Sequence, residues 1–155
     1  MSNKLLLPDA GPIISLGNAG RLWLLKALYG EVVTTRIVAR EITTVTLPNW
    51  LAVVDEVDEK AYRSYLRYLD PGESSVLALA KTYDVPKLLL DDLDARKASR
   101  REGYAVVGTL GIVIAAQQRG LIDDGEALIV QLVREGLWVS NGLIAKAIAL
   151  VKQRN

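Results

Sequence analysis

Short apolar runs alternate along the chain with segments in which apolar residues recur at helical spacing. Such alternation is typical of βαβ units built around a parallel sheet. The runs that predict strands are 5–7, 31–34, 87–90 and 105–107, with 51–54 as a weaker candidate. The pattern therefore predicts an α/β fold, a three-layer α/β/α sandwich with a central parallel sheet of about five strands.

Segments of helical period fill the intervals between these strands. Two short helices are expected after the first strand, separated at 17–20. The remaining helices are predicted over 36–45, 58–69, 73–83 and 93–102, and from 110 to the end with breaks at Gly120, 124–125 and 140–141. Repeats, linkers and low-complexity segments are absent from the sequence, so we expect one domain over residues 1–155.

Composition narrows the chemistry that this domain can perform. The 155 residues are 50% hydrophobic, carry a formal net charge of +1, and include no His and no Cys. A Ser-His-Asp triad, a thiol nucleophile and a zinc-thiolate site are therefore excluded. Apolar runs are too short to span a bilayer and the N-terminus lacks a signal-peptide pattern, so a cytoplasmic protein that does not enter the membrane is expected.

Oxygen-bearing side chains follow three of the predicted strands. Asp9 follows the first, Asp91 and Asp92 follow the run 87–90, and Thr109 follows 105–107. In an open parallel sheet, ligands bind outside the carboxyl ends of the strands. These residues are candidates for one site, although Asp9 could also be a turn acid that caps the next helix.

The position of Glu41 in the sequence supports a shared ligand site over a capping role for Asp9. On a helical wheel, Glu41 falls inside the arc formed by Ile37, Val38, Ile42 and Val45, which should face the core. Burying an unpaired carboxylate is costly, so a cation is the expected partner. The alternative is an acid at the margin of a slightly rotated helix.

Asp91 and Asp92 are successive residues of an extended segment, and their side chains should point in opposite directions. One should bind a ligand and the other should cap the helix that begins at Leu93. We favour Asp92 as the ligand. Nearby, Asp70-Pro71-Gly72-Glu73 has the residue types of a capping box, so a local structural role is favoured for Glu73.

Four basic residues follow these acids. Their spacing pairs Arg96 with Arg100 and Lys97 with Arg101 along the predicted helix. They form either a solvated helix face or a ridge that contacts phosphates.

Carboxylates without His or Cys suit hard divalent cations such as Mg²⁺ or Mn²⁺. Such ions lower the pKa of a bound water and stabilise the leaving oxygen of a phosphodiester. Metal-assisted phosphodiester hydrolysis is therefore the reaction that these residues support best.

Several motifs together resemble the PIN-domain ribonucleases, in particular a small prokaryotic branch related to the toxins of VapBC-type toxin–antitoxin pairs. They are the stretches 9–16, 38–41, 72–73, 89–92 with 95–96, and 108–111. The resemblance implies a five-stranded parallel sheet and Mg²⁺- or Mn²⁺-dependent endoribonuclease activity. It also implies an RNA substrate, a homodimer and inhibition by a small antitoxin protein.

Matched to the family's motifs, Asp9, Glu41 and Asp92 correspond to the first three acids. The fourth acid of many members falls near Thr109, where this sequence departs from the family. A Thr hydroxyl is a neutral ligand or holds a metal-bound water, so a second-ion site should be weak. Asp91 is an additional candidate metal ligand, and Arg96, Lys97, Arg100 and Thr109 are the candidates for contacts with substrate.

Competing functions fit the sequence to different degrees. Thr109 favours a catalytically weak or inactive PIN-like module that binds RNA or protein. A phosphotransfer domain fits less well because the first strand ends in Asp9-Ala10-Gly11 without a second acid, and the sequence contains no phosphate-binding loop of the GxxxxGK[ST] type. The apolar segment around Trp138 predicts self-association, with Trp23 and Trp50 as further candidates.

Overall fold

Five parallel strands form the centre of the computed structural model, which describes residues 4–153. The strands are β1 (Lys4–Pro8), β2 (Gly30–Thr35), β3 (Leu51–Val54), β4 (Lys87–Leu89) and β5 (Ala105–Val107). Their order across the sheet is β3-β2-β1-β4-β5, and every neighbouring pair is parallel. The predicted parallel sheet is confirmed, including the weaker strand candidate.

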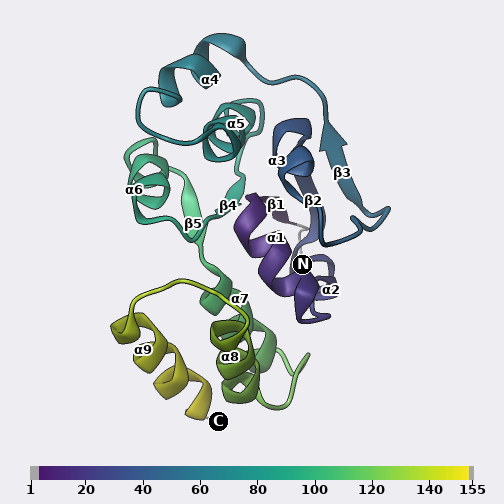
Figure 1. Cartoon of the computed structure of the whole chain (residues 1–155), viewed down its shortest axis with the longest axis vertical. Coiled ribbons are helices and arrows are strands. Elements are labelled where there is room, and N and C mark those ends of the chain that lie inside the picture. Colours follow the sequence, from purple (N-terminus) through teal and green to yellow (C-terminus); the bar gives the residue numbers. More distant parts are fainter. Residues whose placement is uncertain (1–3, 154–155) are drawn as a thin grey trace.

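Helices cover the two faces of this sheet (Figure 1). The helices are α1 (Ala10–Asn18), α2 (Trp23–Tyr29), α3 (Arg36–Glu41), α4 (Glu59–Tyr65), α5 (Pro71–Ala80), α6 (Leu93–Arg101), α7 (Thr109–Gln118), α8 (Gly125–Arg134) and α9 (Asn141–Lys152). Helices α4, α5 and α6 lie on one side, and α2, α7, α8 and α9 lie on the other. The three-layer α/β/α sandwich is thus confirmed, and no helix within residues 4–153 is long and apolar enough to cross a bilayer.

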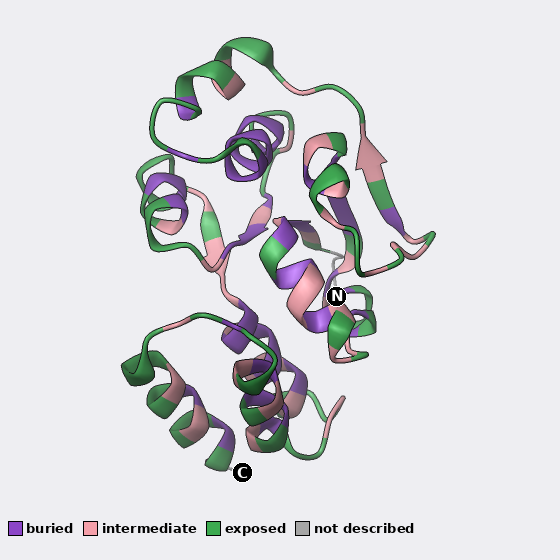
Figure 2. Ribbon diagram, in the orientation of Figure 1, coloured by how far each residue is buried: buried purple, intermediate pink, exposed green. Residues whose placement is uncertain are grey.

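The central strands are buried on both faces. Leu6 and Leu7 in β1 and Leu88 and Leu89 in β4 are all 0% exposed, and Figure 2 shows this buried centre flanked by half-exposed helices. Continuous apolar runs are what a parallel strand requires when helices cover both of its sides. The acids that follow these strands are therefore attached to the most deeply buried part of the sheet.

Several helix boundaries differ from the prediction. The helix expected over 36–45 ends at Glu41, and Ile42 already has an extended backbone. The helix expected over 58–69 ends at Tyr65, and the helix expected to begin at residue 73 begins at Pro71. Apolar residues beyond α3 still contact the core, so their spacing extended the predicted helix past its real end.

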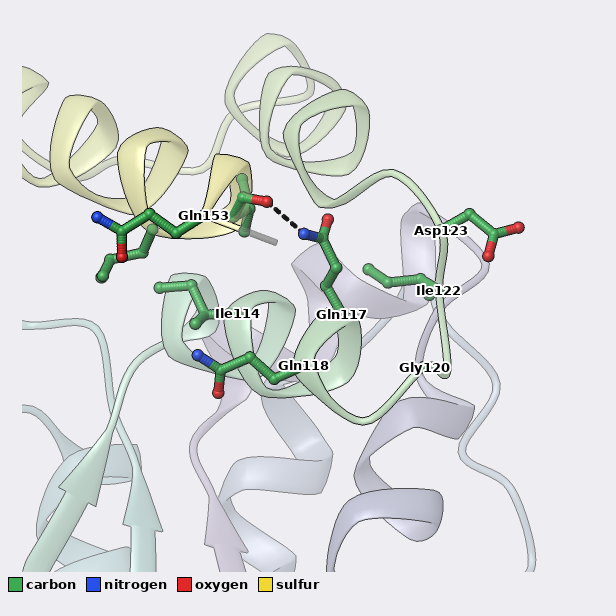
Figure 3. Close-up of a pocket in the computed structure, with 9 residues that line it drawn as sticks. Ile114, Gln117, Gln118, Gly120, Ile122, Asp123 and Gln153 are labelled. Atoms are coloured by element: carbon green, nitrogen blue, oxygen red, sulfur yellow. Dashed lines mark hydrogen bonds between the residues drawn. The ribbon is translucent and has the colours of Figure 1, made fainter. Parts of the chain in front are cut away.

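The C-terminal helices are joined to α7 through one glutamine. Gln117 donates a hydrogen bond to the carbonyl oxygen of Val151 in α9 and accepts one from the backbone N–H of Gly125 at 2.6 Å (Figure 3). A pocket of about 430 Å³ lies beside this amide. Because both polar ends of Gln117 are used, we assign it a structural role that fixes α8 and α9 against α7.

The strand order reverses beside β1. The chain moves from β1 to β2 and β3 on one side, then returns to β4 and β5 on the other. Loops leaving the carboxyl ends of β1 and β4 therefore diverge to opposite faces of the sheet, which opens a crevice where ligands bind in α/β folds. Asp9 lies at this point, and its backbone N–H donates to the carbonyl oxygen of Leu89 at 3.0 Å.

Candidate functional site

Asp9 occupies the N-cap position of α1, but its side chain makes no capping hydrogen bond. The interpretation of Asp9 as an ordinary capping acid is therefore wrong. Burial raises the pKa of Asp9 to about 7, against a smaller lowering effect of the Ala10 N–H, and the carboxylates of Asp70, Glu41 and Asp91 raise it further. A largely buried carboxylate at this position carries an unfavourable charge at neutral pH.

Glu41 is the last residue of α3 and is exposed, so its expected position in a core-facing arc is wrong. Its carboxylate nevertheless points toward the crevice. A Cβ built on Gly72 would overlap Glu41 Oε2 and would lie 3.1 Å from Asp9 Oδ1. The two carboxylates thus face the same point above the first turn of α5. Partial burial and the charge of Asp70 raise the pKa of Glu41.

The junction between α3 and α5 holds Glu41 at this place. The Thr35 hydroxyl caps α3 by accepting from Val38 N at 3.0 Å, and it lies 2.7 Å from the Ser75 hydroxyl in α5. Ser75 in turn donates to the carbonyl oxygen of Gly72 at 2.7 Å. These short contacts bring the two helices together, and Gly72 leaves the space into which Glu41 extends.

Asp91 and Asp92 have roles opposite to those expected with respect to the helix cap. Asp92 Oδ2 accepts from Ala95 N at 3.0 Å and caps α6. Asp91 accepts two hydrogen bonds from Thr109, one from the backbone N–H at 2.8 Å and one from the hydroxyl at 2.5 Å. The expectation that Asp91 is the capping residue is therefore wrong, because the chain turns into α6 one residue later.

Thr109 is fully buried and its hydroxyl is directed to Asp91. Thr109 therefore orients the carboxylate of Asp91 through hydrogen bonds. Thr109 is the first residue of α7, which follows β5, and β5 lies next to β4 in the sheet. The chain segment after one strand thus orients an acid that follows the neighbouring strand.

Two further acids border the same crevice, although their sequence motif is explained by local structure alone. The capping box is confirmed: Glu73 N donates to Asp70 Oδ1 at 2.8 Å, and Asp70 N donates to Glu73 Oε1 at 3.2 Å. Burial raises the pKa of Glu73 to about 8 despite the Asp70 N–H bond, and the charges of Asp70, Asp92 and Asp9 add to this effect. Because the capping box accounts for Glu73 within its own helix, the sequence does not indicate that its carboxyl group also lies near Asp9 and Asp92.

The residues that carry these mutual charge effects form what we call the acidic cluster: Asp9, Glu41, Asp70, Glu73, Asp91 and Asp92. Within residues 4–153, no salt bridge joins any of them to Lys or Arg, and no three acids approach closely enough to form a ready metal-binding group. Oxygen donors that repel one another around a crevice, and that form no salt bridge among the described residues, fit a hard divalent cation.

The basic residues of α6 do not form one ridge. Arg96 Nη1 donates to the carbonyl oxygen of Leu90 at 2.8 Å, and burial together with the charge of Arg100 lowers the pKa of Arg96, while Asp91 opposes this. Lys97, Arg100 and Arg101 are exposed. Arg96 is thus anchored beside the strand end, whereas Lys97, Arg100 and Arg101 lie on the solvent-exposed surface of α6, with the two arginines in its last turn.

Comparison with known proteins gives one match. The family model DUF3368, a PIN domain, matches residues 6–153. No curated protein and no solved structure matches the chain. The matched segment includes every strand except the first two residues of β1, and all six members of the acidic cluster. The chain belongs to the PIN-domain family.

Proposed function

We propose that this protein is a Mg²⁺- or Mn²⁺-dependent endoribonuclease that hydrolyses phosphodiester bonds of RNA. PIN domains are generally nucleases, which supports the reaction class. The observation that carries the proposal is the acidic cluster at the reversal point of the sheet, where a largely buried Asp9 lacks a basic partner among the described residues. Cleavage of mixed RNA with Mn²⁺, compared with chelator, tests it.

Three side chains are the principal candidates to hold the cation. Asp9 and Glu41 face one point above Gly72, and Asp91 is fixed by Thr109. Asp92 remains a candidate through Oδ1, because only its Oδ2 caps α6. When bound, the ion would supply an activated water and stabilise the charge of the leaving oxygen. The residues of this chain would orient the ion and hold the phosphate beside it.

Thr109 should determine how well Asp91 is oriented. Replacing Thr109 by Val removes the hydroxyl donor and keeps the volume, so one buried hydrogen bond to a charged acceptor disappears, with a cost of about 1.5–3 kcal/mol. We expect about ten-fold weaker Mn²⁺ activation of RNA cleavage. Thr109→Ser should keep most of the activity. Equal Mn²⁺ titration curves for the Val variant and the wild type would contradict this support role.

A side chain at Gly72 should impair metal binding, because it would displace the carboxylate of Glu41. The Cβ of Gly72→Ala would overlap Glu41 Oε2, so the Glu41 carboxylate must move away from Asp9. We expect the Mn²⁺ concentration required for half-maximal cleavage to rise about ten-fold. Gly11→Ala is the matched control, because nothing lies within 4 Å of a Cβ at that position of α1. Equal behaviour of the two variants would show that Glu41 is not held there.

The exposed cations of α6 should contribute to RNA binding through phosphates. Neutralising Arg100 and Arg101 to Gln should weaken binding to all RNA sequences alike. It should also reduce the slope of log K against log salt concentration by about 0.7 for each phosphate that the variant no longer neutralises. The salt dependence is measured by fluorescence anisotropy of labelled single-stranded RNA. An unchanged slope would leave these side chains as ordinary solvated surface.

The family resemblance also supports more specific proposals. They are a toxin role in a VapC-type toxin–antitoxin pair, inhibition by a small antitoxin protein, a homodimer and a cytoplasmic location, with residues 1–155 as one PIN-like domain. Sedimentation at micromolar concentration tests the dimer. A neighbouring small gene whose product blocks RNA cleavage tests the antitoxin.

A catalytically weak or inactive module that binds RNA or protein is the second candidate. Two observations favour it: a neutral Thr109 where many members have an acid, and the absence of a ready three-acid metal group within residues 4–153. Binding of RNA without any cleavage in Mn²⁺ would support this alternative.

A further inference from the structure

A pocket of about 720 Å³ opens directly beside the acidic cluster. It is bordered by the start of α6, the end of β5, α7 and α9, so the C-terminal helix forms its far wall (Figure 1). Asp91 and Asp92 line it together with Trp138, Leu143 and Lys146. The pocket is therefore a continuation of the candidate functional site, enclosed by the part of the chain that follows the sheet.

The surface of this pocket is unusual for a protein exterior. Trp138 is 94% exposed, and Leu93 and Leu143 are 60% and 55% exposed. Trp138 stands in the connection between α8 and α9, where it makes little contact with the core. Large apolar side chains gathered at a pocket mark binding sites. Two cationic side chains, Arg96 of α6 and Lys146 of α9, also line this pocket.

We propose that this pocket receives an unpaired nucleobase of the RNA strand whose phosphodiester lies at the acidic cluster; this inference rests on the proposed nuclease function. The base stacks on the indole of Trp138, and Lys146 contacts a phosphate of the same strand. An exposed aromatic plane beside cationic side chains is the combination that single-stranded nucleic acids bind.

The position of the pocket favours RNA over a protein partner. A phosphodiester held by a cation at the acidic cluster would place its adjoining nucleotide next to the opening that Asp91 and Asp92 line. The volume is within the range of about 300–1,000 Å³ of pockets that enclose small organic ligands. Stacking requires a base that is not paired, so the substrate class is single-stranded RNA or an unpaired loop.

The experiment compares the affinity of two probes in Ca²⁺, a hard cation that takes the same oxygen ligands but activates a bound water less than Mn²⁺ does, with cleavage monitored in parallel. One is a short single-stranded RNA of mixed sequence, and the other has the same backbone with abasic residues throughout. Trp138→Ala should weaken binding of the first by about 5- to 100-fold, as removal of one stacked base does, and leave binding of the second unchanged. Trp138→Phe should retain most of the affinity.

Trp23→Ala is the matched control, because Trp23 is an exposed tryptophan of α2 that does not line the pocket. It should bind both probes as the wild type does. Thermal melts should show that Trp138→Ala is folded, since that side chain contributes little to the core.

Three results would overturn the inference in distinguishable ways. Equal effects of Trp138→Ala on both probes, or no effect, with normal cleavage in Mn²⁺, would exclude the base pocket and leave the nuclease function intact. A change in sedimentation from dimer to monomer without a change in RNA affinity would make Trp138 a contact between copies of the chain. A wild type that neither binds nor cleaves RNA would remove the proposed function together with this inference.

Discussion

Replacing Asp9 by Asn should lower Mn²⁺-dependent RNA cleavage by more than about 100-fold while leaving the fold intact. Loss of a residue that only supports a metal ligand costs about 10–100-fold, so loss of a ligand itself should exceed this range. The amide keeps the volume of the carboxylate and removes its charge. Glu41→Gln should have an effect of the same order, because both carboxylates face one point above Gly72.

The matched control is an exposed acid that has no place in the acidic cluster. Glu59 is exposed and pairs with Arg63 at 2.9 Å on the surface of α4. Glu59→Gln should leave cleavage unchanged, since an exposed pair of this kind contributes at most about 1 kcal/mol to stability. Full activity of Asp9→Asn beside this control would exclude a metal-dependent mechanism at the acidic cluster.

The same assay decides between Asp91 and Asp92. The structure favours Asp91 as the ligand, because Thr109 orients its carboxylate while Asp92 caps α6. Asp91→Asn should therefore reduce activity more than Asp92→Asn. The latter should also leave the stability nearly unchanged, because Asn caps a helix about as well as Asp does. The reverse result would restore the assignment that the sequence favours.

The fold could be predicted because apolar runs and helical spacing alternate without ambiguity around β1 and β4. A strand such as Leu5-Leu6-Leu7 has no polar face, which only a sheet covered on both sides permits. The position of Asp9 followed from the same reasoning, since a residue at the carboxyl end of a parallel strand lies at the ligand-binding edge.

The site was less predictable where a residue makes both a local contact, which the sequence indicates, and a long-range contact, which it does not. Glu73 satisfies a capping box with Asp70, so the sequence offered no reason to look further, yet its carboxyl group is buried beside Asp9. Glu41 was identified from the spacing of a longer helix that the structure does not contain. Its place in the site comes instead from the contact of α3 with α5, which is a long-range packing event.

The second large effect concerns stability, and its sign follows from the pKa of Asp9. In the unfolded chain a carboxyl of this kind titrates near the ordinary value of 3.8, and in the folded protein near 7. The folded state therefore holds the proton more tightly. Its stability is unaffected by this group below the lower value, falls as the pH rises between the two, and remains reduced above the higher one.

Asp9→Asn should consequently melt at a higher temperature than the wild type in chelator at pH 8, and this difference should vanish near pH 4. The full pKa shift corresponds to about 4 kcal/mol at 1.36 kcal/mol per unit, and we expect roughly half of it, because the neighbouring carboxylates of the cluster also adjust their protonation. For a chain of this size, a gain of about 2 kcal/mol raises the melting temperature by about 4–8 °C.

Mn²⁺ should reverse the order of the two proteins at neutral pH. A cation that binds the folded wild type stabilises it by about 2.7 kcal/mol at one hundred times its dissociation constant. Asp9→Asn lacks the central carboxylate and should gain little. Thermal melts of both proteins, in chelator and in millimolar Mn²⁺ at pH 4, pH 7 and pH 8, measure all of these differences. If the wild type gains nothing from Mn²⁺ and Asp9→Asn is the less stable protein in chelator, the acids do not form one cation site and the buried charge of Asp9 has a compensating partner.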